Sequence, residues 1–311
     1  MFSKSFESNR LLNSISKDRC LPFIGPETFR LATKDDISSN LLEKYTYPLK
    51  KGDPLTKVSQ YISIKYNDLS AKVMVAEYLT NVKTPDFKLN PESPYAILSS
   101  FDLPIYITTN YDHFMEEALR SRGKEPVSDF CRWSEDLATY AKRAGLRDVF
   151  DPANNYTPSS AKPLVYHLHG DMDTPQSMVL TEKDYFDFLI NIHKLTDTTL
   201  PSNVTTKLTT SRLLFLGYNI EDITFRVIFH GIISLFNTMT ETRLAVSLQL
   251  KNPNIKKEQM NSHVEYLKEY ATKLYNIQII DDELDEFLRT LSIAMDQYKK
   301  EHQTNSKVSI P

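Results

Sequence analysis

The sequence has little of the cysteine on which small secreted domains and many zinc modules depend. Its 311 residues include two cysteines, Cys20 and Cys131. Two cysteines cannot build a disulfide framework or a four-cysteine zinc site. Proteins with so little cysteine commonly work in a reducing compartment, so we expect a cytoplasmic chain, long enough to be stabilised by its own hydrophobic core.

Long hydrophobic runs and a strong charge of either sign are also absent. The N-terminal segment lacks the apolar stretch of a secretory signal, and the longest apolar-rich run, "VIFHGIISLF", has about half the length of a membrane span. The formal net charge is -3, which gives no sign of a basic surface. We therefore expect a soluble protein with neither a membrane nor a nucleic acid as its direct partner.

Four short apolar runs indicate buried strands. They are "LPFIG" (21–25), "IYITTN" (105–110), "LVYHLHG" (164–170) and "LLFLG" (213–217). Each is rich in β-branched or aromatic residues and ends at glycine or asparagine, as buried parallel strands do. The chain has only seven glycines, and Gly25, Gly170 and Gly217 end three of these runs. Residues 243–250 and 276–280 are two further candidate strands.

Helical patterns alternate with these runs. They cover residues 111–122, 181–195, 221–236, 256–275 and 282–300. Strands that alternate with helices predict an α/β fold with a doubly wound, mainly parallel sheet of the Rossmann-like type.

The spacing of the strands also predicts how the domain is organised. About eighty residues, 26–104, separate the first two strands and are mainly helical in pattern, which indicates an inserted helical subdomain. Between residues 121 and 162, "DPANNYTPSS" has the composition of an exposed loop. We expect one α/β domain over residues 1–300, followed by a tail or linker at 301–311.

Polar side chains gather where the predicted strands end. These ends are Gly25–Thr28, Thr109–Asp112, His169–Asp171 and Gly217–Asn219. Ligands of open α/β sheets bind at the carboxyl ends of the strands, and glycine permits close approach of the backbone. Asn110, Asp112 and His169 would supply hydrogen-bonding and proton-transfer groups, so together these ends predict a pocket.

Five segments resemble the ordered landmarks of sirtuin-like domains. They are "FIGPETFR", "ITTNYDHFME", "YHLHGD", "VLTEKDYFDFL" and "LLFLGYNIEDITFRVI". The resemblance spans roughly residues 20 to 290 and is closest to the bacterial branch that degrades NAD in antiviral defence. It implies an NAD glycohydrolase, a hydrolase that yields ADP-ribose and nicotinamide and acts as a toxic effector against phage. It also implies control by homo-oligomerisation, by a regulatory partner subunit or by a sensor domain outside this chain.

The same resemblance implies roles for individual residues. Asn110 would orient the nicotinamide-side ribose or the attacking water, and His169 would be the base that acts on a ribose hydroxyl or on that water. Asp112 would anchor the carboxamide or orient its neighbours. The residues that would bind NAD, here a substrate, are Gly25, Thr28, Arg30, Thr109, Asp112, Gly217, Tyr218 and Asn219. No metal is expected.

Two features depart from the sirtuin pattern. The usual Gly-Ala-Gly followed by serine is replaced by Gly25-Pro26-Glu27-Thr28. Pro26 has no backbone N–H, and a Glu27 side chain that faced a pyrophosphate would repel it, although Thr28 and Arg30 could compensate. The four-cysteine zinc module of protein-deacylating sirtuins is also missing, which disfavours a protein deacylase.

Simpler interpretations of these motifs stay open. His167 and His169, two apart in a strand, would share a face and could both be buried core residues, or could bind a metal with Asp171 and Asp173. We expect His167 to be a structural neighbour of His169. "TTNYD" and "GYN" could simply cap helices. The remaining histidines show no matching constellation: His113, His193, His230, His263 and His302. A non-catalytic nucleotide-binding or oligomerisation module is the alternative function.

Overall fold

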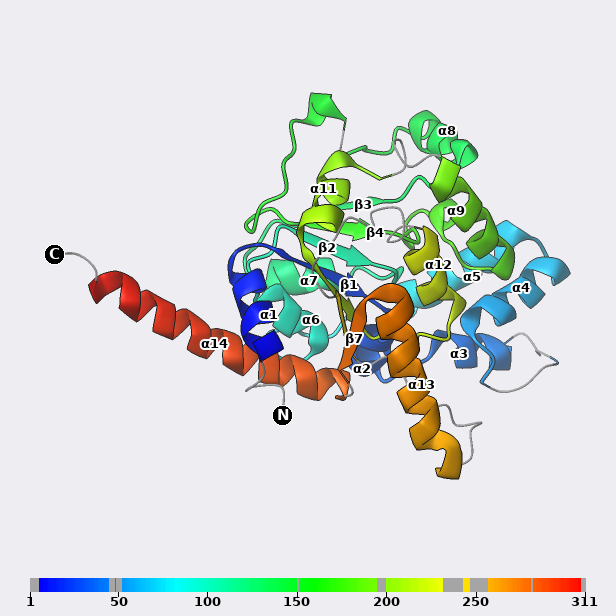
Figure 1. Ribbon diagram of the computed structural model, residues 1–311. Coiled ribbons are helices and arrows are strands. Elements are labelled where there is room, and N and C mark those ends of the chain that lie inside the picture. The colour runs from blue at the N-terminus through cyan, green and yellow to red at the C-terminus, as the bar shows by residue number, and fades with distance from the viewer. Residues whose placement is uncertain are drawn as a thin grey trace.

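A seven-stranded parallel sheet organises the computed structural model (Figure 1). The structure describes residues 6–44, 48, 52–149, 151–194, 200–231, 243–246, 257–280 and 282–308. Within them the strand order is β3-β4-β2-β1-β5-β6-β7, and every neighbouring pair is parallel. The strands are β1 (Cys20–Ile24), β2 (Ile105–Thr108), β3 (Val127–Phe130), β4 (Leu164–His167), β5 (Arg212–Leu216), β6 (Arg243–Val246) and β7 (Ile277–Ile280).

The predicted α/β fold is confirmed. All six predicted strands are present, with ends that differ by a few residues, and residues 247–250 of the fifth lie outside the described part. The edge strand β3 was not predicted, because "VSDF" is short and half polar. Its Asp129 carboxylate accepts hydrogen bonds from the Arg132 guanidinium at 3.0 Å and from the Val149 N–H at 3.1 Å. These bonds explain how a buried carboxylate is tolerated in a strand.

Helices cover both faces of the sheet. They are α1 (Phe6–Ser16), α2 (Pro26–Thr33), α3 (Ile37–Lys44), α4 (Leu55–Lys65), α5 (Asp68–Asn81), α6 (Pro94–Ser99), α7 (Phe114–Ser121), α8 (Glu135–Arg143), α9 (Glu182–Lys194), α11 (Ser202–Thr210), α12 (Ile223–Gly231), α13 (Lys257–Tyr275) and α14 (Leu284–Val308), with short 3-10 turns η2 (Pro152–Asn154) and η3 (Pro175–Ser177). None of the described helices is long and apolar enough to cross a membrane.

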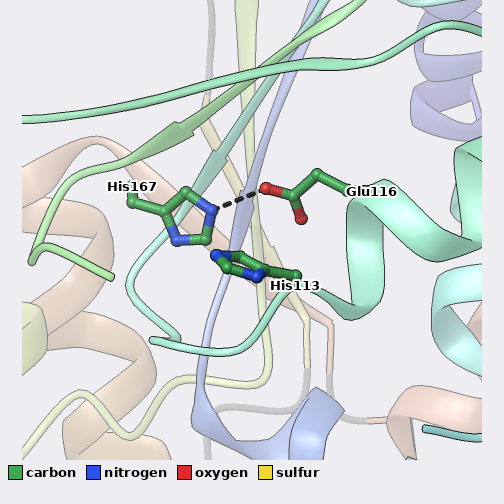
Figure 2. A group of neighbouring side chains, drawn as sticks. All are labelled: His113, Glu116 and His167. Carbon is green, nitrogen blue, oxygen red and sulfur yellow. Dashed lines mark hydrogen bonds and ion pairs between the residues drawn. The ribbon is translucent and has the colours of Figure 1, made fainter. Parts of the chain in front are cut away.

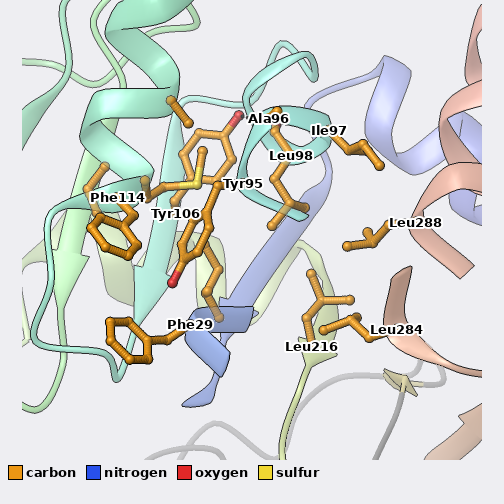
Figure 3. Packing of buried hydrophobic residues seen from close by; sticks show 14 of the residues in the cluster. Phe29, Tyr95, Ala96, Ile97, Leu98, Tyr106, Phe114, Leu216, Leu284 and Leu288 are labelled. Atoms are coloured by element: carbon orange, nitrogen blue, oxygen red, sulfur yellow. Dashed lines mark hydrogen bonds between the residues drawn. The ribbon is translucent and has the colours of Figure 1, made fainter. Parts of the chain in front are cut away.

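Alternation along the strands divides the core in two. On β5, Leu214 and Leu216 face one hydrophobic cluster, whereas Leu213 and Phe215 face the other. This is the period of two expected for a strand buried on both faces. Figure 3 shows the first cluster, in which residues from α2, α6, α7, β5 and α14 come together: Phe29, Tyr95, Phe114, Leu216, Leu284 and Leu288.

Helices α2 to α6 lie between β1 and β2, the stretch for which we expected a helical insertion. Helix α4 packs against α5 and α9. Lys72 of α5 forms a buried ion pair with Asp184 of α9, with 2.9 Å between Nζ and Oδ1. The stretch is therefore anchored to a helix that follows β4. Helix α14 continues to Val308, through most of the residues expected to form a tail, and projects from the body in Figure 1.

Candidate functional site

A cavity of about 580 Å³ lies at the carboxyl ends of β1, β2 and β5. This volume is within the usual range for small-molecule sites. Seven of the predicted site residues line it: Arg30, Thr109, Asn110, Asp112, Gly217, Tyr218 and Asn219. Residues of α3, α9 and α12 complete the wall, including Tyr185 and Thr224. Gly25, Thr28 and His169 do not belong to the lining.

Gly25 and Gly217 let two strand-end turns pack against each other. The Gly25 N–H donates to the Leu216 carbonyl at 2.8 Å. A Cβ atom on Gly25 would lie 2.7 Å from the Gly217 carbonyl oxygen, and one on Gly217 would lie 2.8 Å from Cβ of Glu27. Because Cβ atoms do not approach so closely, both positions require glycine for internal packing, whatever ligand the cavity holds.

The hydrogen-bond donors in the first turn of α2 are bonded to other groups of the protein. Pro26 has no N–H, the Glu27 N–H donates to the Gly217 carbonyl at 3.2 Å, and the Thr28 N–H donates to the Gly25 carbonyl at 3.1 Å. The Thr28 hydroxyl is buried and also donates to the Gly25 carbonyl, at 2.7 Å. The Arg30 guanidinium is bonded to the Glu27 carboxylate. The Thr28 hydroxyl and the Arg30 guanidinium, which were expected to compensate for the altered turn by binding a pyrophosphate, thus form their hydrogen bonds within the protein.

Negative charge dominates the cavity wall. Eight of its lining residues are acidic: Glu27, Asp35, Asp36, Asp53, Asp112, Glu182, Glu221 and Asp222. Arg30 is the cationic residue of the lining within the described part of the chain, and it is already paired with Glu27. Such a wall favours a cationic group, such as a pyridinium ring, and disfavours a pyrophosphate.

Asn110 lies just beyond β2, and its side chain is anchored on the side away from the cavity. Its Nδ2 donates to the Tyr95 hydroxyl at 2.9 Å, to Thr28 Oγ1 at 3.0 Å and to the Gly25 carbonyl at 3.2 Å. Within the described residues Nδ2 makes all of the side chain's hydrogen bonds, which leaves Oδ1 for the cavity. The hydroxyls of Thr109 and Tyr218 lie 3.0 Å apart beside it and join the ends of β2 and β5.

Asp112 provides a carboxyl group whose titration lies near neutrality. Its Oδ1 accepts the Phe114 N–H at 2.9 Å at the start of α7, and the residue is 5% exposed. Burial raises the pKa of Asp112 to about 6; the Phe114 N–H opposes this rise, and the nearby charge of Glu116 adds to it. The "TTNYD" segment therefore begins a helix and also lines the cavity, so the capping interpretation and the ligand-binding one are compatible.

His169 lies behind the cavity wall. It is fully buried, and neither ring nitrogen has a hydrogen-bond partner among the described residues. Its ring packs edge-on against Tyr185 and Phe188, with centroids 5.2 Å away in both cases. Burial lowers the pKa of His169 to about 3, so the ring is neutral. Tyr185 both touches His169 and lines the cavity, and it therefore stands between the predicted base and a ligand.

The expectation that His167 and His169 share a face of the sheet is wrong. Strand β4 ends at His167, and the chain turns at Gly170, where φ is +82°. His167 therefore points toward α7, whereas His169 packs against the aromatic side chains of α9. That geometry does not place the two rings together as ligands of one metal.

His167 instead forms a buried ion pair with Glu116 (Figure 2). Its Nε2 lies 2.7 Å from Glu116 Oε1, and its Nδ1 lies 3.1 Å from the Asn110 carbonyl oxygen. Burial opposes protonation of His167, but the charge and hydrogen bond of Glu116 outweigh it and raise the pKa to about 9. Burial likewise opposes ionisation of Glu116, but His167 lowers its pKa overall. The ring is thus an imidazolium that donates in both directions.

His113 stands beside this pair, contrary to the expectation that it belongs to no constellation. The His113 and His167 rings have centroids 5.6 Å apart. Ligand atoms of His113, Glu116 and His167 lie within 4.8 Å of one another, a donor set that could hold zinc. The 2.7 Å contact between His167 and Glu116 is a charge-assisted hydrogen bond, so we assign an ion pair. The spacing of His113 and Glu116, three apart directly after "TTNYD", is the sequence signal that could have revealed the cluster.

Comparison with known proteins agrees with this fold. Residues 104–279, from the beginning of β2 into β7, match the family model described as "SIR2-like domain". A protein named "NAD(+) hydrolase ThsA" from Enterococcus faecium is 30% identical over 128 residues, which are 41% of this chain and 22% of that protein. A protein of the same name from Bacillus cereus (strain MSX-D12) is 24% identical over 181 residues, 54% of this chain and 33% of its own length.

The chain thus spans a third or less of the length of these two relatives. The family match includes Asn110, Asp112, His169 and the Gly217 turn, and it leaves out the altered turn after β1. Because this match covers more than half of the chain, the protein belongs to the SIR2-like domain family.

Proposed function

We propose that this protein is an NAD glycohydrolase that cleaves NAD to ADP-ribose and nicotinamide. The observation that carries the proposal is the pair Asn110 and Asp112, which lie together in a cavity at the carboxyl ends of the strands. The names of the two relatives, both NAD(+) hydrolases, support the same class of reaction. We further propose, from the resemblance to bacterial defence effectors, that the enzyme is a regulated toxic effector against phage.

The proposed chemistry does not require a general acid in the site. Nicotinamide leaves NAD as a neutral ring, so its departure requires no general acid, and the transition state has oxocarbenium character. In the proposal Asn110 Oδ1 orients the ribose or the attacking water, and the acidic wall stabilises positive charge on the sugar. His169 can act as the base only after the Tyr185 side chain moves aside. We propose that oligomerisation, a partner subunit or a further domain controls this step.

The direct test is incubation of the purified protein with NAD, alone and with candidate partner proteins, followed by separation of the products. Equimolar release of ADP-ribose and nicotinamide supports the proposal. The alternative, a nucleotide-binding or oligomerisation module without turnover, is favoured by the engaged donors of the Glu27–Thr28 turn and by the burial of His169. Binding of NAD without product under every condition would select that alternative.

The pH profile of the reaction provides a second prediction. Because the pKa of Asp112 is raised to about 6, we expect kcat/KM to fall as the pH drops below about 6 and this carboxylate gains a proton. His169, with a pKa of about 3, and His167, with a pKa of about 9, do not change charge in that window. Steady-state rates from pH 5 to 8 measure the effect.

Asp112→Asn is the matched variant for that profile. It keeps the size of the side chain and an oxygen to accept the Phe114 N–H, but it cannot ionise. We expect this variant to be slow and to lack the acid limb. An unchanged acid limb in the variant would exclude Asp112 as the titrating group.

A further inference from the structure

The backbone of Asn110 is held by side chains instead of by the sheet. Strand β2 ends at Thr108, so Asn110 lies outside the strand pairing. Its N–H donates to Thr108 Oγ1 at 3.0 Å, and its carbonyl oxygen accepts from His167 Nδ1 at 3.1 Å. Because Nδ2 is also anchored, the direction in which Oδ1 enters the cavity depends on these few hydrogen bonds.

His167 is in turn fixed from behind. Its Nε2 donates to Glu116 Oε1, which also accepts the Ser128 hydroxyl at 2.8 Å. Both members of the pair are almost completely shielded, at 0% exposure for His167 and 1% for Glu116. A line of hydrogen bonds therefore runs from β3 through α7 and the end of β4 to Asn110. Figure 2 shows its central link, between Glu116 and His167.

A buried ion pair of this kind is an inefficient way to stabilise a fold. Removing two charges from water is costly, and well-packed apolar residues of the same size commonly stabilise a fold as well or better. What the pair provides instead is a fixed direction for the hydrogen bond from His167 to the Asn110 carbonyl. Hydrogen bonds from a charged donor are stronger than neutral ones, and the Glu116 contact keeps the second ring proton on Nδ1, aimed at the Asn110 carbonyl.

We propose that His167 and Glu116 are positioning residues that hold Asn110 in its catalytic orientation. The inference rests on the proposed function, because the orientation matters to the reaction only if Asn110 takes part in it. Neither side chain lines the cavity, so neither touches the substrate. They act through the Asn110 backbone, and their loss should lower kcat more than it raises KM.

Two variants of His167 separate positioning from simple stabilisation. The amide nitrogen of asparagine falls near the place of Nδ1, and that of glutamine near the place of Nε2. His167→Asn therefore keeps a donor to the Asn110 carbonyl, and His167→Gln keeps a donor to Glu116. We expect kcat to fall about 100-fold in His167→Gln and about tenfold or less in His167→Asn, since a shift of about 1 Å can cost that much. KM should stay within about threefold in both.

Glu116→Gln tests the other end of the line. This variant keeps an acceptor for Nε2 but removes the charge, and we expect a kcat between those of the two His167 variants. Hydrogen exchange of the backbone amides in residues 109–115 provides a readout without substrate. Exchange should be faster in His167→Gln than in His167→Asn.

The outcomes are distinct. Equal losses of kcat in the two His167 variants, in proportion to their loss of folded protein, would overturn the positioning role. A wild-type protein with no turnover would overturn the proposed function, and the exchange measurement alone would then decide whether His167 holds Asn110. Equal exchange in both variants would exclude it.

Discussion

Replacing Asn110 with alanine is expected to reduce NAD cleavage by about 1,000-fold in a protein that remains folded. Removal of a single group that stabilises charge in a transition state commonly costs two to three powers of ten in kcat, which corresponds to about 3 to 4 kcal/mol. In this cavity the group is Asn110 Oδ1, because the amide nitrogen is committed to Tyr95, Thr28 and Gly25. The measurement is nicotinamide release at saturating NAD.

The control for this variant is Tyr95→Phe. It removes the hydroxyl that accepts from Asn110 Nδ2 at 2.9 Å and leaves Asn110 in place. If Asn110→Ala acted only by loosening the strand-end network, the two variants would lose similar activity. We expect about tenfold for Tyr95→Phe, and folding of both is checked by circular dichroism. Turnover of Asn110→Ala within about tenfold of wild type would remove Asn110 from the mechanism.

The fold could be predicted from the sequence because its signals are local. The apolar runs that end at Gly25, Gly170 and Gly217 correspond to β1, β4 and β5, and a strand buried on both faces is apolar throughout. Strand β3 lies at the edge of the sheet, where one face needs less apolar cover. Its polar residues therefore interrupt the apolar pattern from which a strand is predicted. The location of the cavity followed from the same rule, since parallel strands bring their carboxyl ends to one edge.

The roles of the two histidines could not be predicted in this way. Whether His169 points to the cavity or away from it depends on where β4 stops, because side chains alternate between the two faces only while the strand continues. The partner of His167 is Glu116, which lies 51 residues away and is brought near by the crossover through α7. Pairing across that distance leaves no local pattern.

The turn after β1, where the sequence departs from the sirtuin pattern, uses its polar side chains within the protein. Glu27 lines the cavity and also holds Arg30, whereas Thr28 turns inward to support Asn110. The turn thus stabilises the catalytic side of the proposed site at the expense of donors for a pyrophosphate.

The largest effect on stability is expected from Lys72→Met. Lys72 and Asp184 are 8% and 7% exposed, and their charged atoms are 2.9 Å apart. Methionine fills the volume of the lysine stem but leaves the Asp184 carboxylate buried without its counter-ion. Breaking a buried pair in this way costs about 3 to 5 kcal/mol. We expect a loss of that size in the free energy of unfolding, measured by urea denaturation.

An exposed ion pair on α9, the helix that contains Asp184, provides the control. Lys183 pairs with Asp187 at 2.6 Å, but the two side chains are 61% and 40% exposed. Because water and salt screen such a pair, we expect Lys183→Met to cost less than about 1 kcal/mol. Similar losses in both variants would show that the Lys72 pair is not an anchor.

The Lys72 anchor also bears on the site. The Asp184 carboxylate accepts the N–H groups of Leu180 and Thr181 at the start of α9, and the next residue is Tyr185, which separates His169 from the cavity. Lys72 thereby ties the helical stretch between β1 and β2 to the side chain that, in the proposed mechanism, moves before His169 acts. If the anchor holds Tyr185 in place, Lys72→Met should change NAD turnover at temperatures where the protein stays folded, whereas Lys183→Met should not. Equal turnover in the two variants would confine the role of Lys72 to stability.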